Sequence, residues 1–204
     1  MKGKRLLVLT CAFLVLGAGI AYASSPWGDF QGFTKVKVLI NNEEAITGEV
    51  PAFVISGRAV LPMRSLTTSM QGLLKWDDAT KTASIYKPNV HMFVARDVNK
   101  DYQIKQPFGK VKQGDKIDFV VFPQVDNLDT PIYAFKIEIV RPDGNVLRSS
   151  DPAVLNEPME SFWYPWPFSG VTFDAYGDYK VHFLMKLSPE DDWTVVSEKV
   201  IKSE

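Results

Sequence analysis

Two histidines, His91 and His182, are the residues with which this chain could carry protons or bind a transition metal near neutral pH. A methionine lies close to each of them, Met92 and Met185, and imidazole with thioether is ligand chemistry that suits copper. A blue-copper site also needs a cysteine thiolate, however, and each histidine sits in an apolar stretch typical of a strand. We therefore expect no metal and no cofactor, and both histidines are predicted to be structural.

Sequence motifs for catalysis are missing as well. The chain has no nucleophile elbow, no phosphate-binding glycine loop and no zinc-protease motif. The acidic turns at 77–78, 126–129 and 190–192 lack the alternating ligands and the glycine of a calcium loop, so solvated turns explain them. Paired carboxylates for glycoside hydrolysis have no fixed spacing in sequence, which leaves a small hydrolase as one alternative. We expect no catalytic residues.

The most unusual segment is the aromatic run Phe162-Trp163-Tyr164-Pro165-Trp166-Pro167-Phe168. In an extended conformation its four even-numbered aromatic residues share one face, whereas Trp163 points the other way. One interpretation is a strand whose four-residue face packs in a core or between domains, and alternation of this kind favours it. The other is a stacking platform for sugar rings or a docking face for an envelope protein. The candidate partner contacts are Trp163, Trp166 and Tyr164, with Trp163 predicted to be exposed and Trp166 predicted to be buried.

The N-terminus has the pattern of an export signal. Three basic residues among positions 2–5 precede the apolar run Leu6–Ile20, and Ala21-Tyr22-Ala23 has the small-x-small pattern of a signal peptidase site. The apolar run is short for a membrane anchor, which needs about 20 residues. A lipoprotein would use Cys11, but Thr10 does not fit the small residue expected before it. Residues 1–23 are predicted to be a cleaved signal peptide, so the protein is expected to be secreted or associated with the cell wall or envelope.

Removal of the signal would leave 181 of the 204 residues, without a cysteine, and would change the formal charge from −1 to −4 because three positive charges are lost. A chain without disulfides must be stabilised by packed cores. A negative surface does not suit nucleic acid or an anionic membrane as a partner. The length is comfortable for two domains.

Short strand and turn signals fill residues 30–97. A strand predicted at 34–40 runs into the turn Asn41-Asn42, and residues 63–71 have apolar side chains at helical spacing before Gly72, a suitable C-cap. Further strands are predicted at 52–55, 59–61, 73–76, 82–86 and 90–95.

The order of these signals resembles the copper amine oxidase N-terminal-like domain, also called the stalk domain, of secreted Gram-positive bacterial proteins. The resemblance is carried by Ile40-Asn41-Asn42, Gly57-Arg58-Ala59-Val60-Leu61-Pro62-Met63-Arg64, Leu74-Lys75-Trp76-Asp77 and Thr80-Lys81-Thr82-Ala83-Ser84-Ile85. It implies a small antiparallel sheet curled around one helix over residues 30–97. It also implies an envelope accessory module, because this domain carries neither the copper ligands nor the quinone cofactor of the oxidase.

Residues 98–110 are polar and are predicted to be a linker to a second domain at 111–204. That domain has strand after strand and no helix signal, which favours an immunoglobulin-like β-sandwich. The segment Asp174–Val181 resembles a tyrosine corner, with Gly177 at the turn and Tyr179 two residues before the usual cysteine position, occupied here by Val181. The predicted fold class is mainly β, an α+β domain followed by an all-β domain.

These observations together predict a bacterial binding module without catalytic activity. Its expected partner is an envelope protein or a cell-wall polysaccharide, with no nucleic acid and no membrane span after signal cleavage. A regulator or inhibitor of a secreted enzyme is the alternative from another functional class.

Overall fold

The computed structural model describes residues 26–46 and 48–204, and the predicted signal peptide lies outside these residues. The described chain divides into two compact units at Pro62–Met63. Over the described residues the fold is mainly β, as the sequence predicts. The sequence also predicts one small sheet curled around a helix at 30–97; the structure instead has separate two-stranded hairpins there, and the helix falls in the second unit. No helix in this part of the chain is long and apolar enough to cross a membrane.

The described residues of the first unit, 26–46 and 48–62, form three antiparallel hairpins. Their strands are β1 (Asp29–Phe30), β2 (Phe33–Thr34), β3 (Leu39–Ile40), β4 (Glu43–Glu44), β5 (Phe53–Ile55) and β6 (Arg58–Val60). The predicted turn at Asn41 and Asn42 is confirmed, since both residues have positive φ, 52° and 68°, as a tight hairpin turn requires. The predicted strand 34–40 is wrong in its length, because it is interrupted between β2 and β3 and only Lys35 bridges to Phe53.

The second unit begins with helix α2 (Met63–Ser69) and the antiparallel hairpin of β7 (Leu73–Asp77) and β8 (Thr82–Tyr86). The helix ends at Ser69, two residues before the predicted end, and the left-handed residue is Gln71, with φ 56°, and not Gly72. A Cβ on Gly72 would lie 3.0 Å from the Cγ2 atom of Thr67. Glycine is therefore needed there for close packing of the chain against the helix, and not for its backbone angle.

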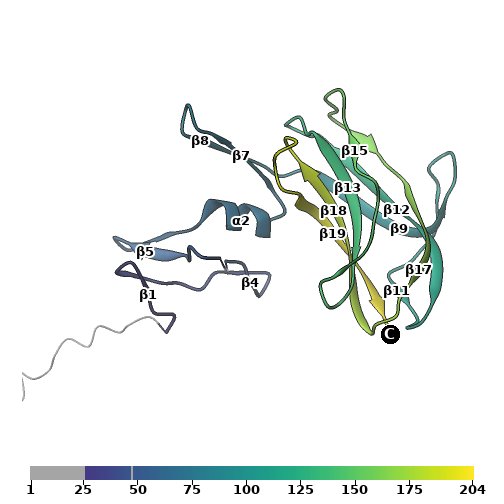
Figure 1. The fold of residues 1–204 in the computed structure, drawn as a ribbon, viewed down its shortest axis with the longest axis horizontal. Coiled ribbons are helices and arrows are strands. Elements are labelled where there is room, and N and C mark those ends of the chain that lie inside the picture. The colour runs from purple at the N-terminus through teal and green to yellow at the C-terminus, as the bar shows by residue number, and fades with distance from the viewer. Residues whose placement is uncertain (1–25, 47) are drawn as a thin grey trace, which may run out of the picture. The chain divides into compact units, whose positions relative to one another are not determined.

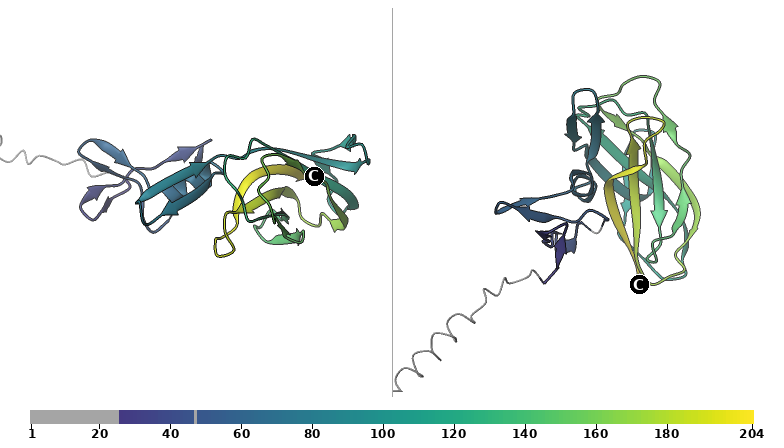
Figure 2. Two further views of the ribbon diagram at one scale, coloured as in Figure 1. Left: turned by 90° about the horizontal axis from the view of Figure 1, so that it is seen from above. Right: turned by 60° about the vertical axis from the view of Figure 1, so that its left-hand side comes forward.

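Two sheets make up the rest of the second unit (Figures 1 and 2). The first sheet contains β10 (Ile104–Pro107), β9 (Asn89–Val98), β12 (Lys116–Asp126), β16 (Phe162–Trp163) and β17 (Trp166–Thr172). The second contains β11 (Lys110–Val111), β19 (Thr194–Ser203), β18 (Gly177–Lys186), β13 (Ala134–Val140), β14 (Val146–Ser149) and β15 (Ala153–Val154). Strands β9, β12 and β17 face β13, β18 and β19, which is the division of strands A, B and E from C, F and G in an immunoglobulin-like sandwich.

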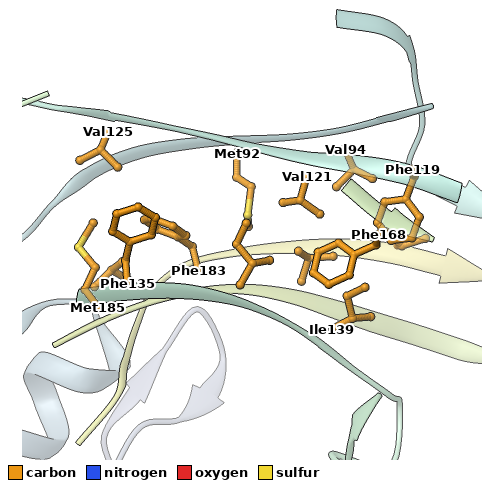
Figure 3. Close-up of a cluster of buried hydrophobic side chains, with 14 of the residues drawn as sticks. Met92, Val94, Phe119, Val121, Val125, Phe135, Ile139, Phe168, Phe183 and Met185 are labelled. Atoms are coloured by element: carbon orange, nitrogen blue, oxygen red, sulfur yellow. The ribbon is translucent and has the colours of Figure 1, made fainter. Parts of the chain in front are cut away.

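The core of the sandwich lies between the two sheets (Figure 3). Val94, Val121 and Phe168 from the first sheet are buried against Phe183 and Ile139 from the second. Along β12 and β18, the more buried residues alternate with the more exposed ones. This is the period-two pattern on which the sequence prediction rests.

The predicted tyrosine corner is confirmed. Tyr179 is fully buried, its hydroxyl donates to the Asp174 carboxylate at 2.9 Å, and it accepts from the backbone N–H of Ala175 at 2.9 Å. The Arg141 guanidinium, at 3.3 Å, and then the Tyr179 hydroxyl lower the pKa of Asp174. These bonds tie the entrance of β18 to the loop before it.

Residues 98–110, predicted to be a linker, are instead part of the sandwich. Strand β10 pairs with β9, β11 pairs with β19 in parallel, and residues 89–95 of β9 pair with β12. The segment looks like a linker in sequence because β10 is a solvated edge strand, where Lys105 lies opposite Asp97 at 3.8 Å. The strand predicted at 90–95 therefore belongs to the sandwich and not to a separate first domain.

Candidate functional site

The outer face of the first sheet, which points away from the core, is the candidate site. Side chains of directly paired residues in a sheet lie on the same face. Trp163 on β16 pairs with Gln124 on β12, and Gln124 pairs in turn with His91 on β9. Phe122 pairs with Phe93 in the neighbouring row. These five residues come from three adjacent strands and share the outer face.

Four rings gather there: Phe93, Tyr102, Phe122 and Trp163, which we call the aromatic face. Tyr102, from the loop between β9 and β10, stacks on Phe122 with a ring-centre distance of 5.9 Å and an angle of 11°. Trp163 stands edge-to-face to both, at 5.3 Å from Tyr102 and 5.9 Å from Phe122. Phe122 is only 4% exposed, yet it is outside the core cluster, because Tyr102 and Trp163 cover it.

The other three rings of the aromatic face are open to solvent. Trp163 is 49% exposed, Tyr102 46% and Phe93 41%. Since Phe122 covers one side of the Tyr102 ring, the exposed area of Tyr102 includes the opposite side. Trp163 and Tyr102 thus form a right-angled corner of rings with accessible surface on the outside of the sheet.

Polar groups that can form directed hydrogen bonds flank the aromatic face at Trp163. Gln124 is half-buried beside Trp163, and its amide nitrogen donates to the Asp126 carboxylate at 2.9 Å. His91 is exposed on the other side of Gln124. An amide, a carboxylate and an imidazole offer both donors and acceptors next to an apolar ring surface. This combination suits a ligand with apolar faces and hydroxyl edges.

The predicted contact residues fall on two different faces. Trp163 is exposed, as predicted. Trp166 is half-buried and stacks on Tyr164 at 5.8 Å, while Tyr164 stands edge-to-face to Phe135 of the core at 4.7 Å. Burial raises the pKa of the Tyr164 hydroxyl. The structure therefore places Tyr164 and Trp166 on the core side, so that neither joins Trp163.

Sequence reasoning missed three members of the aromatic face: Phe93, Tyr102 and Phe122. Phe93 and Phe122 lie in apolar strands, where they look like core residues. Tyr102 offered a signal, because it is a lone aromatic residue in the polar stretch 97–106.

The two histidines lie on different sheets and have different neighbours. His91 lies on the outer face of the first sheet, and His182 is on β18 with its Nε2 atom 2.9 Å from the Glu198 carboxylate. Within residues 26–46 and 48–204, no group of three or more histidine, cysteine and acidic side chains is arranged to hold a metal.

Apart from the aromatic face, a hollow of about 520 Å³ lies at the loops of the sandwich. It is lined by Asn127–Pro131 and Pro158–Glu160. Its lining has one long flexible apolar side chain, Met159, and no aromatic ring. It therefore offers less rigid contact area than the aromatic face.

Comparison with known families adds one finding. Residues 34–107, about a third of the chain, match the family model of the copper amine oxidase N-terminal domain. No curated protein matches the chain. In copper amine oxidases this N-terminal domain is a non-catalytic accessory domain. The match extends through β9 and β10, so it includes Phe93 and Tyr102, whereas Phe122 and Trp163 lie beyond it. The resemblance drawn from the sequence motifs is thus confirmed: residues 34–107 of this chain are similar to the copper amine oxidase N-terminal domain.

Proposed function

We propose that this protein is an exported, non-catalytic accessory protein of the bacterial cell envelope and that its aromatic face binds a wall polysaccharide. The observation that carries the proposal is the cluster of Phe93, Tyr102 and Trp163, three accessible rings on one sheet face. Large exposed aromatic clusters are unfavourable in water and usually mark a binding surface.

A sugar is the ligand that fits the mixture of groups best. The C–H faces of a pyranose ring stack on aromatic rings, while its hydroxyl groups need donors and acceptors at the edge. Gln124, Asp126 and His91 supply these beside Trp163. The nearby charges of Lys105 and Asp97 lie 3.8 Å apart and offset each other.

Glycan binding without hydrolysis is supported by the state of the carboxylates on this sheet. Canonical glycosidases use two carboxyl groups on either side of the bond to be cut. Here Asp126 accepts from Gln124, Asp118 accepts from the backbone N–H of Gly170 at 2.6 Å, and Asp97 lies 3.8 Å from Lys105. Each carboxylate is thus held by its own partner. The non-catalytic character of the matched N-terminal domain points the same way.

Export is supported by the signal-peptide pattern of residues 1–23, with cleavage after Ala23. N-terminal sequencing of the protein from culture medium and cell wall is expected to start at Ser24. Retention of Met1, or a lipid on Cys11, would contradict the proposed route.

Binding is tested with the mature protein, residues 24–204, and purified, protein-free cell-wall glycan from a Gram-positive bacterium. Wild-type protein should bind, and Trp163→Ala should lose at least about tenfold in affinity, because a central aromatic anchor typically contributes more than 1.4 kcal/mol. Trp76→Ala is the matched control, since Trp76 is 53% exposed but lies on β7.

A pull-down from solubilised envelope separates this function from its rival. Capture of one stoichiometric protein, with no retention on glycan, would favour a regulator or inhibitor that docks on a protein. Equal loss of glycan binding in Trp163→Ala and Trp76→Ala would contradict the aromatic face as the site.

A further inference from the structure

One residue, Asn99, holds the loop that carries Tyr102. Its side-chain oxygen accepts from the backbone N–H groups of Asp101 at 3.1 Å and Gln103 at 2.7 Å. Its side-chain nitrogen donates to the Gln103 side chain at 2.9 Å. Its backbone also bonds across the loop: its carbonyl accepts from the Tyr102 N–H at 3.0 Å, and its N–H donates to the Gln103 carbonyl at 3.2 Å. All the polar groups of Asn99 are thus used to shape residues 99–103.

The loop holds Tyr102 in an unfavourable backbone conformation. Its φ is 57°, in the left-handed region that glycine adopts at little cost and that other residues rarely adopt. The ring is nevertheless 46% exposed, so burial returns only part of the cost. Backbone strain held at an exposed side chain is typical of functional sites.

We propose that Asn99 is a positioning residue, which pre-forms the ligand site by fixing Tyr102 over Phe122 and against Trp163. This inference rests on the proposed function, because it assigns Asn99 a role at the glycan-binding face. A loop that is already ordered does not lose its freedom on binding, so the ligand keeps more of its interaction free energy. Asn99 itself needs no contact with the ligand.

Two substitutions at Asn99 separate positioning from direct contact. Asn99→Ala removes both side-chain acceptor bonds and the donor bond, and we expect about a fivefold to tenfold loss of affinity for the same wall glycan. Asn99→Asp keeps an oxygen that accepts from the Asp101 and Gln103 N–H groups, so affinity should return to within about threefold of wild type. The matched control is Asp143→Ala, which removes a similar loop bond, from the Asn145 N–H at 2.9 Å, elsewhere in the sandwich.

A second measurement is independent of any ligand. In protein labelled with 5-fluorotryptophan, the Trp163 resonance, assigned with Trp163→Phe, senses the ring current of Tyr102. Asn99→Ala should shift it toward the position found in Tyr102→Gly, whereas Asp143→Ala should leave it unchanged.

The outcomes distinguish the two proposals. If wild-type protein does not bind glycan, the proposed function fails, and the fluorine spectra still decide whether Asn99 fixes Tyr102. If wild type binds and Asn99→Ala binds equally well, or if its Trp163 resonance does not move, the positioning role is overturned. Loss of affinity in Asn99→Asp as large as in Asn99→Ala would also overturn it.

Discussion

The first sheet of the sandwich has aromatic residues on both faces, and the exposure of these residues differs between the two faces. On the inner face Phe119, Phe162 and Phe168 are buried in the core shared with the second sheet. On the outer face Trp163 and Tyr102 remain about half exposed, although they contact each other. Phe162 and Trp163 are consecutive in the chain, yet one is buried and the other exposed, because successive side chains of a strand point to opposite faces. Within this strand, alternation thus decides that Phe162 stabilises the fold and that Trp163 is available for binding.

The largest effect is expected on the inner face. Phe168→Ala should lower the free energy of unfolding by about 3–5 kcal/mol, because it leaves a cavity among Phe119 and its neighbours. Urea denaturation of the mature protein, followed by circular dichroism, measures it. An unchanged midpoint would mean that this face is not the core.

A pair of tryptophan substitutions compares the two faces directly. Trp166→Ala should cost about 2–4 kcal/mol, since Trp166 is half-buried against the core, and Trp163→Ala about 1 kcal/mol or less. Trp163→Ala should instead lose binding. Thermal melts and glycan binding of both variants test this. A Trp163→Ala protein that melts early, or that still binds fully, would make Trp163 a structural residue.

The tyrosine corner tests the same core from the second sheet, because Tyr179 is on β18. Tyr179→Phe should lower stability by about 1 kcal/mol, because it removes a buried hydroxyl with two hydrogen bonds. Tyr176→Phe is the control, since Tyr176 is close in sequence but exposed. Equal melting of Tyr179→Phe and wild type would show that the corner contributes nothing to stability.

Tyr102→Gly sharpens the comparison from the outer face. Relief of the positive φ and loss of the ring packing oppose each other, so stability should change by less than about 1 kcal/mol. Affinity for glycan should nevertheless fall. A loss of stability as large as that of Phe168→Ala would contradict the distinction between the faces.

The smallest expected effect is on the stability of the protein at low pH. The pKa of Asp174 is held below its usual value of 3.8 by the Arg141 guanidinium and then by the Tyr179 hydroxyl. A carboxylate whose pKa is lowered by folding stabilises the protein fully above that usual value, and the contribution disappears as the pH falls through the lowered pKa. The decrease in stability from about pH 5 to about pH 2 should therefore be smaller in Asp174→Asn than in wild type. If the stability of Asp174→Asn and of wild type changed with pH in the same way, Asp174 would have no such role.

Local patterns were sufficient for several features. Residue preferences and strand alternation within a few positions account for four of them: the turn at Asn41-Asn42, the helix before Gly72, the corner at Tyr179 and the outward direction of Trp163. The sequence misled where an exposed strand looks like a loop, because β10 is as polar as a linker. Whether residues 98–110 are free or paired depends on β9 and β19, which are other parts of the chain.

The sequence by itself determined the fold class, the stalk-domain motifs and which residues of a strand share a face, because these depend on neighbours along the chain. The tertiary structure decided that Trp163 contacts Phe122 and Tyr102 and that Phe93 lies beside Phe122 on the same face. These residues come from β16, β12, β9 and the loop after β9, and only the register of the paired strands brings them together. Register is set by the packing of the whole sheet against the core, so no local pattern around Trp163 contains it.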